Sequence, residues 1–256
     1  MAIVSDDATI GVAMTFRATE FEFRYRFWFI AGIIWLGFLL YRIDHTNISF
    51  ALSRVILGHP DENSATLDRG VIAFFWLGTL IVALAALVRS WAESYLHSSI
   101  VHDSALHGEQ LVADGPFRHL RNPLYLGTVL LTIGIGVLAS RIGFVVMSVA
   151  MFLFTYRLIL REETTLLQSQ GESYRRYFAA VPSLIPSLRP RVPASGAKPN
   201  WLDGFTGEIF MWGAVAAMAV FSLTQNIVYF WIALGSGFVL YFLQYFFRFR
   251  RRKSAA

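Results

Sequence analysis

The sequence contains no cysteine among its 256 residues. This absence excludes disulfide bonds, thiolate nucleophiles and thiolate metal ligands, and with them several classes of enzyme. Charged residues are also scarce, at 15%, whereas hydrophobic residues make up 55% of the chain. Together with a mean hydropathy of +0.52, this balance lies outside the range that is usual for soluble domains. The composition therefore predicts an integral membrane protein.

The N-terminal region has no long apolar run before residue 27, and the first run lacks a small-residue cleavage site. We therefore expect no cleaved signal peptide. Six apolar runs follow, and the longer ones approach the ~20 residues that cross a bilayer. They lie at residues 27–41, 70–88, 124–139, 142–160, 208–223 and 227–247. The predicted fold is all-α, a polytopic membrane protein with about six transmembrane helices.

Positive charge is nearly absent from one side of this predicted topology. All but four of the 22 Lys and Arg residues fall on the side that holds both termini, the exceptions being Arg42, Arg54, Arg69 and Arg141. The positive-inside rule makes the Arg-rich side cytoplasmic. We expect a bacterial inner (plasma) membrane protein with cytoplasmic N and C termini. The basic tail at residues 248–253 is expected to contact anionic lipid headgroups rather than nucleic acid.

Proline is uncommon except in one segment, where it interrupts helix formation. The prolines of this segment are Pro182, Pro186, Pro190, Pro193 and Pro199. The predicted division is a membrane core at residues 1–186, a Pro-rich cytoplasmic linker at 187–207, and a C-terminal transmembrane helix pair with the basic tail at 208–256. The membrane portions of that pair carry no evident catalytic polar group, so we expect it to serve packing or anchoring.

Two shorter patterns predict local structure. Ile48, Leu52, Val55 and other apolar residues recur at helical spacing in an otherwise polar segment, which predicts a short helix in the membrane interface. Gly134-Ile135-Gly136 lies inside an apolar run without a preceding strand, so it is not a dinucleotide-binding loop. Small residues there favour close packing between helices.

A polar, turn-rich cassette at residues 111–125 comes directly before the third apolar run. It contains Asn122-Pro123, in which the Asn side chain is expected to cap a helix whose first residue is the proline. Gly115 and Pro116 form an ordinary turn, and the neighbouring arginines are typical interfacial anchors. Each feature has a structural explanation, and it is their concentration at a membrane edge that indicates a functional site.

A second polar cassette, residues 161–177, follows the fourth run and should return to the same membrane face. Glu162 and Glu163 would face an unfavourable dipole if the helix ended there. Neighbouring arginines or a bound cation would compensate. Tyr174 and Tyr177 share a helical face that can offer aromatic contact to such a cation. The alternative is an amphipathic cytoplasmic helix.

Histidine does not form a metal-binding pattern. His97, His102 and His107 are spaced by five, about 140° apart around a helix, rather than by the four that places two ligands on one face. With no cysteine present, we expect no metal site.

The two cassettes together resemble the isoprenylcysteine carboxyl methyltransferase and phospholipid methyltransferase superfamily of integral membrane enzymes, over about residues 107–186. In the first cassette the matching residues are Leu111-Val112, Gly115, Phe117, Arg121-Asn122-Pro123, Tyr125 and Gly127. In the second they are Glu162-Glu163-Thr164-Thr165-Leu166 and Gly171-Glu172-Ser173-Tyr174-Arg175-Arg176-Tyr177.

This resemblance implies a cytoplasm-facing S-adenosylmethionine site at the helical hairpin. The implied cofactor-binding residues are Leu111, Val112, Phe117, Asn122, Pro123, Leu124, Tyr125, Glu162, Glu163 and Tyr174. Arg121 and Glu163 are the implied catalytic residues, with Arg121 orienting the acceptor or neutralising charge. A sulfonium is a cation, which carboxylates and aromatic faces can hold.

The acceptor implied by the resemblance is a lipophilic or lipid molecule that enters from the bilayer. Phe117, Asn122, Glu109 and Leu158 depart from the isoprenylcysteine subgroup, so the sequence looks more like the broad bacterial and phospholipid-directed members. A carboxylate acceptor and a headgroup amine, as in phosphatidylethanolamine N-methylation, both stay open. The alternative from another class is a non-catalytic membrane scaffold with a degenerate cofactor site.

Overall fold

The computed structural model describes residues 16–103 and 113–254, apart from the side chains of residues 97–103, 244, 245 and 247–254. Within these residues the chain is helical, with one isolated β-bridge between Asn47 and Ser140. The elements are α2 (Glu20–Arg24), α3 (Arg26–Leu39), η1 (Leu40–Arg42), α4 (Ile48–Ile56), α5 (Ala65–Asp103), η2 (Gly115–Arg118), α6 (Pro123–Gly136), α7 (Arg141–Ala180), α8 (Trp201–Gly207), α9 (Ile209–Thr224) and α10 (Ile227–Ser254).

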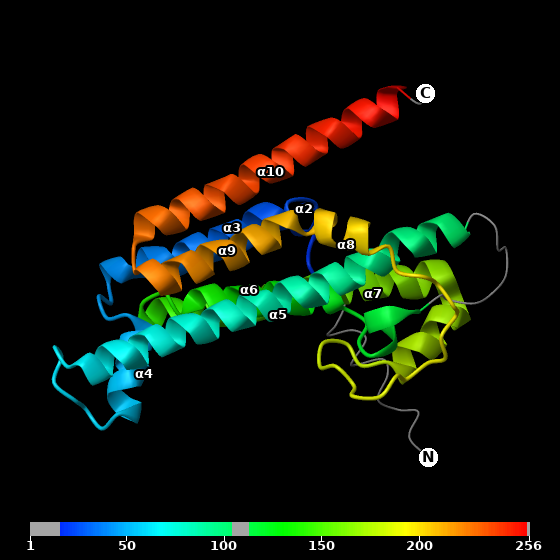
Figure 1. Cartoon of the computed structure of the whole chain (residues 1–256). Coiled ribbons are helices and arrows are strands. Elements are labelled where there is room, and N and C mark those ends of the chain that lie inside the picture. The colour runs from blue at the N-terminus through cyan, green and yellow to red at the C-terminus, as the bar shows by residue number, and fades with distance from the viewer. Residues whose placement is uncertain (1–15, 104–112, 255–256) are drawn as a thin grey trace, which may run out of the picture.

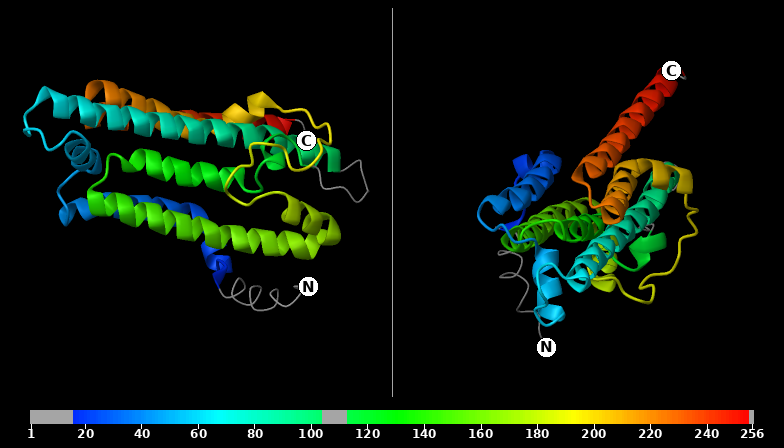
Figure 2. Two further views of the ribbon diagram at one scale, coloured as in Figure 1. Left: turned by 90° about the horizontal axis from the view of Figure 1, so that it is seen from below. Right: turned by 60° about the vertical axis from the view of Figure 1, so that its left-hand side comes forward.

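The long helices lie side by side, with α6 between α5 and α7 (Figure 2). Helix α3 packs on α7, while α9 packs on α5 and α10 packs on α9. At one end of the bundle lie α4 and the loop after it (Figure 1). The two polar cassettes and the segment after α7 lie at the other end. The hairpin α6–α7 therefore brings the two cassettes together, as the sequence predicts.

Each of the six predicted apolar runs falls mainly within one helix. By length and composition, α5 over Ala65–Leu96 and α7 over Arg141–Ala180 can each cross a membrane. Helices α8 and α9 meet at a 62° bend and pass the same test as a pair, which gives up to three spans among the described residues. Helix α6 and the Ile227–Leu243 part of α10 are apolar but shorter. The all-helical fold is confirmed for the described residues, with two or three spans able to cross a membrane, while the number of six spans stays a prediction.

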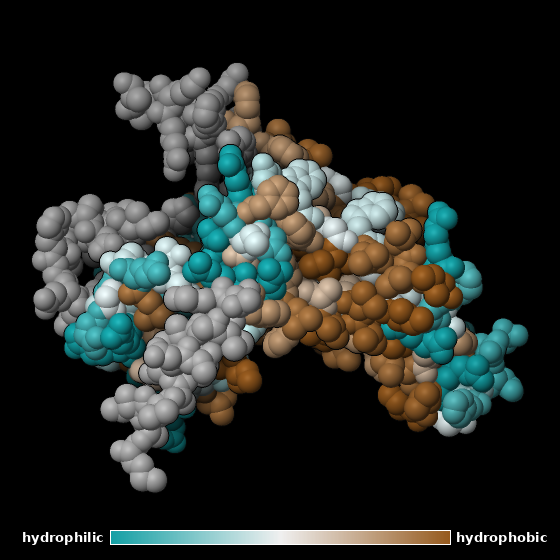
Figure 3. Space-filling view, turned by 180° about the vertical axis from the view of Figure 1, so that it is seen from behind, coloured by the Kyte–Doolittle hydropathy of each residue, from teal (hydrophilic) through white to brown (hydrophobic). Residues whose placement is uncertain are grey.

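The surface of the bundle carries the apolar character that lipid contact requires. A brown, apolar region covers the middle of the face in Figure 3 and is bordered by teal, polar regions. Large side chains are widely exposed on several helices, including Trp28 and Trp35 on α3 and Leu80 on α5. Exposure of this extent is typical of membrane or protein contact rather than of a water-facing surface.

The predicted interfacial helix is α4, at the end of the bundle opposite the cassettes. The side chain of Asn47 caps it by accepting from the backbone N–H of Ser49 (2.8 Å) and Phe50 (3.2 Å). The tight turn between α6 and α7 is held beside it, because Ser49 Oγ donates to the Val137 carbonyl oxygen at 2.7 Å. At the same end of the bundle, Asp44 forms an ion pair with Arg141 at 3.0 Å.

The glycines of α6 allow close packing on both sides of this helix. A Cβ at Gly134 would lie 2.8 Å from the carbonyl oxygen of Gly78 on α5, and one at Gly136 would lie 2.7 Å from the Phe144 ring on α7. Real Cβ atoms do not approach so closely, so any larger residue would push the helices apart. The packing role predicted for these small residues is confirmed.

Candidate functional site

A cavity of about 570 Å³ lies between α3, α5, α6 and α7 at the cassette end of the bundle. Its volume falls within the ~300–1,000 Å³ that is typical of small-molecule sites. The first cassette contributes Phe117 and the run from Arg121 to Tyr125, and the second contributes Glu162 and Tyr174. The cavity thus brings together the described cofactor-binding candidates, with the exception of Glu163.

The wall formed by α6 begins at the Asn-Pro pair. Pro123 is in the first turn of α6, and Asn122 occupies the N-cap position. The side chain of Asn122, however, makes no capping hydrogen bond. Its Nδ2 instead donates to Glu163 Oε1 at 2.9 Å and to Ser183 Oγ at 3.1 Å. The capping role expected for Asn122 is therefore wrong, because a buried carboxylate nearby takes its amide.

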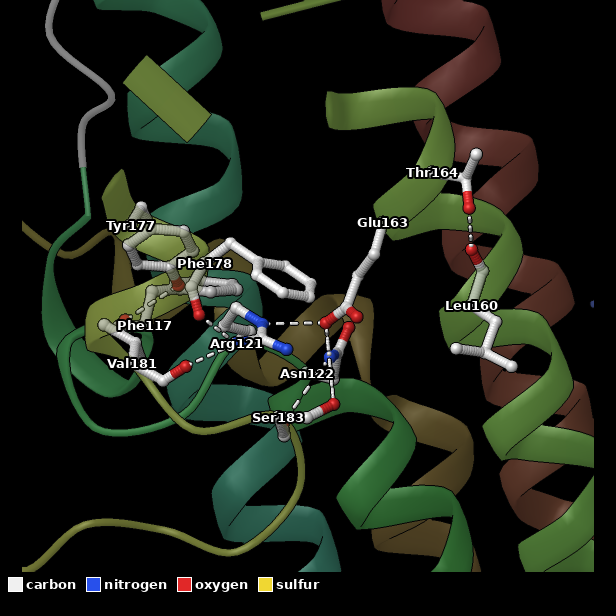
Figure 4. A network of polar contacts seen from close by, with 10 residues as sticks. All are labelled: Phe117, Arg121, Asn122, Leu160, Glu163, Thr164, Tyr177, Phe178, Val181 and Ser183. Carbon is white, nitrogen blue, oxygen red and sulfur yellow. Dashed lines mark hydrogen bonds and ion pairs between the residues drawn. The ribbon is translucent and has the colours of Figure 1, made fainter. Parts of the chain in front are cut away.

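Arg121 lies at the centre of a buried network (Figure 4). Its Nε donates to Glu163 Oε1 at 2.8 Å, and its Nη1 donates to the carbonyl oxygens of Phe178 (2.5 Å) and Val181 (2.6 Å). The guanidinium carbon lies 4.0 Å from the centre of the Phe178 ring. Such charge-assisted hydrogen bonds are stronger than neutral ones. Arg121 therefore holds the segment after α7 against the start of α6.

The two adjacent glutamates lie in different surroundings. Helix α7 continues to Ala180, so neither carboxylate faces a helix C-terminus. Glu162 lines the cavity and interacts with the hydroxyl of Tyr125. Glu163 is 5% exposed and is enclosed by Arg121, Asn122 and Ser183. Successive helical residues point about 100° apart, which places one carboxylate in the cavity and the other behind its wall.

The aromatic wall depends on a break in α7. Gly171 has φ 58° and ψ −131°, a conformation that glycine adopts without steric cost. The residues after it fold back, so that Tyr174 and Tyr177 pack with Leu166 from the earlier part of the same helix. Tyr177 then donates its hydroxyl to the Phe117 carbonyl oxygen at 2.8 Å. The second cassette is thereby fixed directly against the first.

Other helices supply cavity residues that the motifs do not indicate. Arg26 comes from α3, Arg89 and Tyr95 come from α5, and Gln170 comes from α7. Arg89 follows directly after an apolar run, a position in which arginine commonly serves as a membrane anchor. The position of Arg89 in the sequence therefore does not by itself indicate a functional site. Tyr95 lies so close to Gly115 that a Cβ there would be 2.4 Å from its ring.

The Pro-rich segment between α7 and α8 is bound to the site. Asp114 is buried and accepts from the backbone N–H of Ser195 (3.1 Å) and Ala197 (2.8 Å), and from the Ser195 hydroxyl. Arg118 Nε donates to the Val192 carbonyl oxygen at 2.9 Å. Ala197 itself lines the cavity. This segment therefore forms part of the cavity wall in addition to connecting two parts of the chain.

Two groups of predictions fall outside the described residues. Leu111 and Val112, predicted to bind the cofactor, are not described. The same holds for the side chains of the histidines at 97, 102 and 107 and of the basic tail. Among the residues that are described, no group of three or more His, Asp or Glu side chains is placed to hold a metal ion.

Comparison with known proteins gives this geometry a family context. Residues 73–173 match the model of the phospholipid methyltransferase family. A protein-S-isoprenylcysteine O-methyltransferase of Dictyostelium discoideum is 28% identical over 45% of the chain and 51% of its own length. Both matches support the resemblance of the two cassettes to this superfamily of membrane methyltransferases.

The chain is also similar to two bacterial proteins that are named for metal resistance. A cobalt-zinc-cadmium resistance protein of Cupriavidus metallidurans is 25% identical over 55% of the chain and 61% of its own length. A nickel-cobalt-cadmium resistance protein of Alcaligenes xylosoxydans xylosoxydans is 24% identical over 55% of the chain and 62% of its own length. The chain therefore spans about three fifths of the length of these relatives. No solved structure matches the chain.

Proposed function

We propose that this protein transfers a methyl group from S-adenosylmethionine to a lipophilic acceptor that enters from the bilayer. The observation that carries the proposal is the shared cavity. Asn122 to Tyr125 from one cassette and Glu162 and Tyr174 from the other line the same space. These residues are far apart in the sequence, and they line one cavity because the α6–α7 hairpin returns the chain to the same end of the bundle.

The residues of the cavity fit the proposed cofactor chemically. A sulfonium carries a positive charge, which a carboxylate attracts and an aromatic face stabilises. Glu162 supplies the carboxylate, while Tyr125, Tyr174 and Phe117 supply aromatic surface. When bound, S-adenosylmethionine supplies an electrophilic methyl group. The chain's residues would hold and orient it, and positioning of two reactants can itself lower a barrier by several kcal/mol.

The acceptor is proposed to be a lipid or another lipophilic molecule of the membrane. The match to the phospholipid methyltransferase family supports a headgroup amine, as in phosphatidylethanolamine N-methylation. The similarity to an isoprenylcysteine O-methyltransferase supports a carboxylate. An amine must lose a proton and benefits from a nearby base, whereas a carboxylate benefits from a cation that places it. Glu162 and Arg26 line the same cavity and supply one group of each kind.

The proposed setting is a bacterial inner membrane, with about six spans and both termini in the cytoplasm. The cavity would then face the compartment in which S-adenosylmethionine is available. Anionic headgroups would contact the basic tail, since each Lys or Arg near an anionic surface contributes about 1 kcal/mol.

Binding of S-adenosylmethionine to nanodisc-held protein, measured by calorimetry, tests the proposal. We expect binding by the wild type and weaker binding by Tyr125→Ala. The matched control is Glu62→Gln, which removes a carboxylate that is 68% exposed at the far end of the bundle. Binding should be followed by incubation with membrane lipids and mass measurement of the products. A folded wild-type protein that binds no S-adenosylmethionine would instead favour the non-catalytic scaffold.

A further inference from the structure

The side chain of Arg89 links three elements at the edge of the cavity. Its Nε and Nη2 donate to the two carboxylate oxygens of Glu208, at 2.7 and 2.8 Å. Its Nη1 donates to the Leu124 carbonyl oxygen at 3.0 Å and to Thr128 Oγ1 at 3.2 Å. All three guanidinium nitrogens are thus engaged by the protein. Arg89 therefore connects α5 and the start of α9 to the first turn of α6.

That first turn of α6 is a wall of the cavity. Leu124, its neighbour Tyr125 and Arg89 all line the cavity. The position of this turn is therefore set by a side chain from α5, and the position of that side chain is set by Glu208. Glu208 lies between α8 and α9, directly at their 62° bend.

Glu208 is 6% exposed and directly precedes α9, a helix that contains no ionisable residue. A buried ion pair is weak evidence for a stabilising role, because well-packed apolar residues often stabilise a fold equally well. Ionisable residues within membrane proteins more often mark functional sites. An ion pair that served only to anchor α9 would need no charged side chain at the cavity wall, where Arg89 lies.

The approach of α8 and α9 to this part of α5 is supported at several neighbouring positions. A Cβ at Gly204 would lie 2.4 Å from the Ser90 carbonyl oxygen, so glycine is required there for contact. Trp212 Nε1 donates to Ser90 Oγ at 3.0 Å. Gly127 on α6 leaves room for the Arg89 stem, since a Cβ there would lie 2.3 Å from Arg89 Cγ. The Gly204 and Trp212 contacts keep α8 and α9 close to α5, and Gly127 leaves Arg89 room to reach Glu208.

We propose that Glu208 is a positioning residue of the methyl-transfer site, which makes the C-terminal helix pair part of the functional unit; this inference rests on the function proposed above. Glu208 acts through Arg89, which holds the first turn of α6 and hence Leu124 and Tyr125. Residue 208 lies beyond the 73–173 region that matches the family. The functional unit of this chain is thus longer than the matched region.

The test compares four proteins in nanodiscs: wild type, Glu208→Gln, the double variant Arg89→Leu/Glu208→Leu, and the control Glu62→Gln. Binding of S-adenosylmethionine, kcat, KM and Tm are measured for each. Displacement of a reacting group by about 1 Å can lower a rate up to about 10²-fold, so we expect kcat/KM to fall about tenfold or more in Glu208→Gln. The apolar double variant should keep a Tm near that of the wild type and still lose activity. Glu62→Gln should match the wild type.

A second readout does not depend on activity. Because the chain has no cysteine, Leu124→Cys introduces a single thiol into the wall. Its labelling by a maleimide should become several-fold faster when Glu208→Gln is added. Equal labelling with and without Glu208→Gln would overturn the inference. So would a Glu208→Gln variant that has a lower Tm but unchanged affinity and kcat/KM, because the ion pair would then be only structural. If the wild type itself binds no S-adenosylmethionine, the proposed function fails and this inference fails with it.

Discussion

Glu162 and Glu163 are adjacent in the chain, yet their carboxylates contact different partners. Substitution of each by Gln should therefore separate ligand binding from folding. Glu162 faces the cavity, so we expect Glu162→Gln to weaken S-adenosylmethionine binding about tenfold, which corresponds to about 1.4 kcal/mol, with little change in Tm. Calorimetry and thermal unfolding measure the two effects on the same preparation.

Glu163→Gln should behave in the opposite way. Its partner Arg121 has a side chain only 9% exposed, and removal of one member of a buried ion pair typically costs about 3–5 kcal/mol. We expect a clearly lower Tm, and any loss of binding should accompany the loss of folded protein. A Glu163→Gln variant with wild-type Tm and no binding would instead give Glu163 the direct cofactor role that the family resemblance implies.

The two cassettes in the sequence locate the site, but they do not say which glutamate enters the cavity. That choice depends on the rotation of α7 against α6, which is set by packing. The predicted cap at Asn122 was wrong for a similar reason, since the buried Glu163 carboxylate competes for its side chain. Arg89 and Glu208, which are 119 residues apart, leave no pattern in sequence because their contact exists only in the folded chain.

Asp44 gives a pH-dependent prediction at the end of the bundle away from the cavity. Hydrogen bonds from the Arg141 guanidinium and from the backbone N–H of Ile142 and Thr46 lower the pKa of its carboxyl from 3.8 to about 2. A lowered folded-state pKa contributes stability above the unfolded-state value, and this stability is lost as pH falls through the folded one. Asp44→Asn should therefore be less stable than the wild type at pH 6.

The difference in stability between Asp44→Asn and the wild type should stay constant down to about pH 5 and shrink as the pH approaches the folded-state pKa of about 2. Thermal unfolding across this pH range measures it. A difference that does not change between pH 5 and pH 3 would mean that the carboxylate charge contributes nothing to the contact.

At the scale of elements, the separation of α5 and α6 depends on glycine. A Cβ at Gly134 would lie 2.6 Å from Val82 Cγ2 and 2.8 Å from the Gly78 carbonyl oxygen. Because backbone cannot move aside as a side-chain end can, Gly134→Ala should destabilise the protein by about 1–3 kcal/mol, as overpacking does elsewhere. Gly235→Ala is the matched control, since nothing lies within 4 Å of a Cβ there.

The control should be neutral or stabilise the protein by up to about 1 kcal/mol, because Ala favours helix more than Gly. Denaturant unfolding in detergent distinguishes the two variants. Equal effects of both substitutions would mean that α5 and α6 can separate without cost.

This element-level packing was predictable from the small residues of the third apolar run. The fold-back after Gly171 was not, because its positive φ depends on which surfaces are available to Tyr174 and Tyr177.

At the scale of the whole molecule, the distribution of Lys and Arg in the sequence predicts how the protein is oriented in the membrane. All but four of the 22 Lys and Arg residues lie on the cavity side of the predicted topology, which should therefore be cytoplasmic. The absence of cysteine allows a direct test. Asn63→Cys places one thiol on an exposed residue in the loop after α4, and Ser169→Cys places one on an exposed residue of α7 near the cavity.

In intact cells, a membrane-impermeant maleimide should label Asn63→Cys at once and should label Ser169→Cys only after the membrane is opened. Both side chains are exposed, so neither substitution disturbs packing, and the cysteine-free parent gives the background. The reverse pattern would place the cavity outside the cytoplasm, away from a supply of S-adenosylmethionine, and would contradict both the orientation and the proposed use of that cofactor. Labelling of both positions in intact cells would mean that the hairpin does not separate two compartments, in which case a lipid acceptor could not enter in the way proposed.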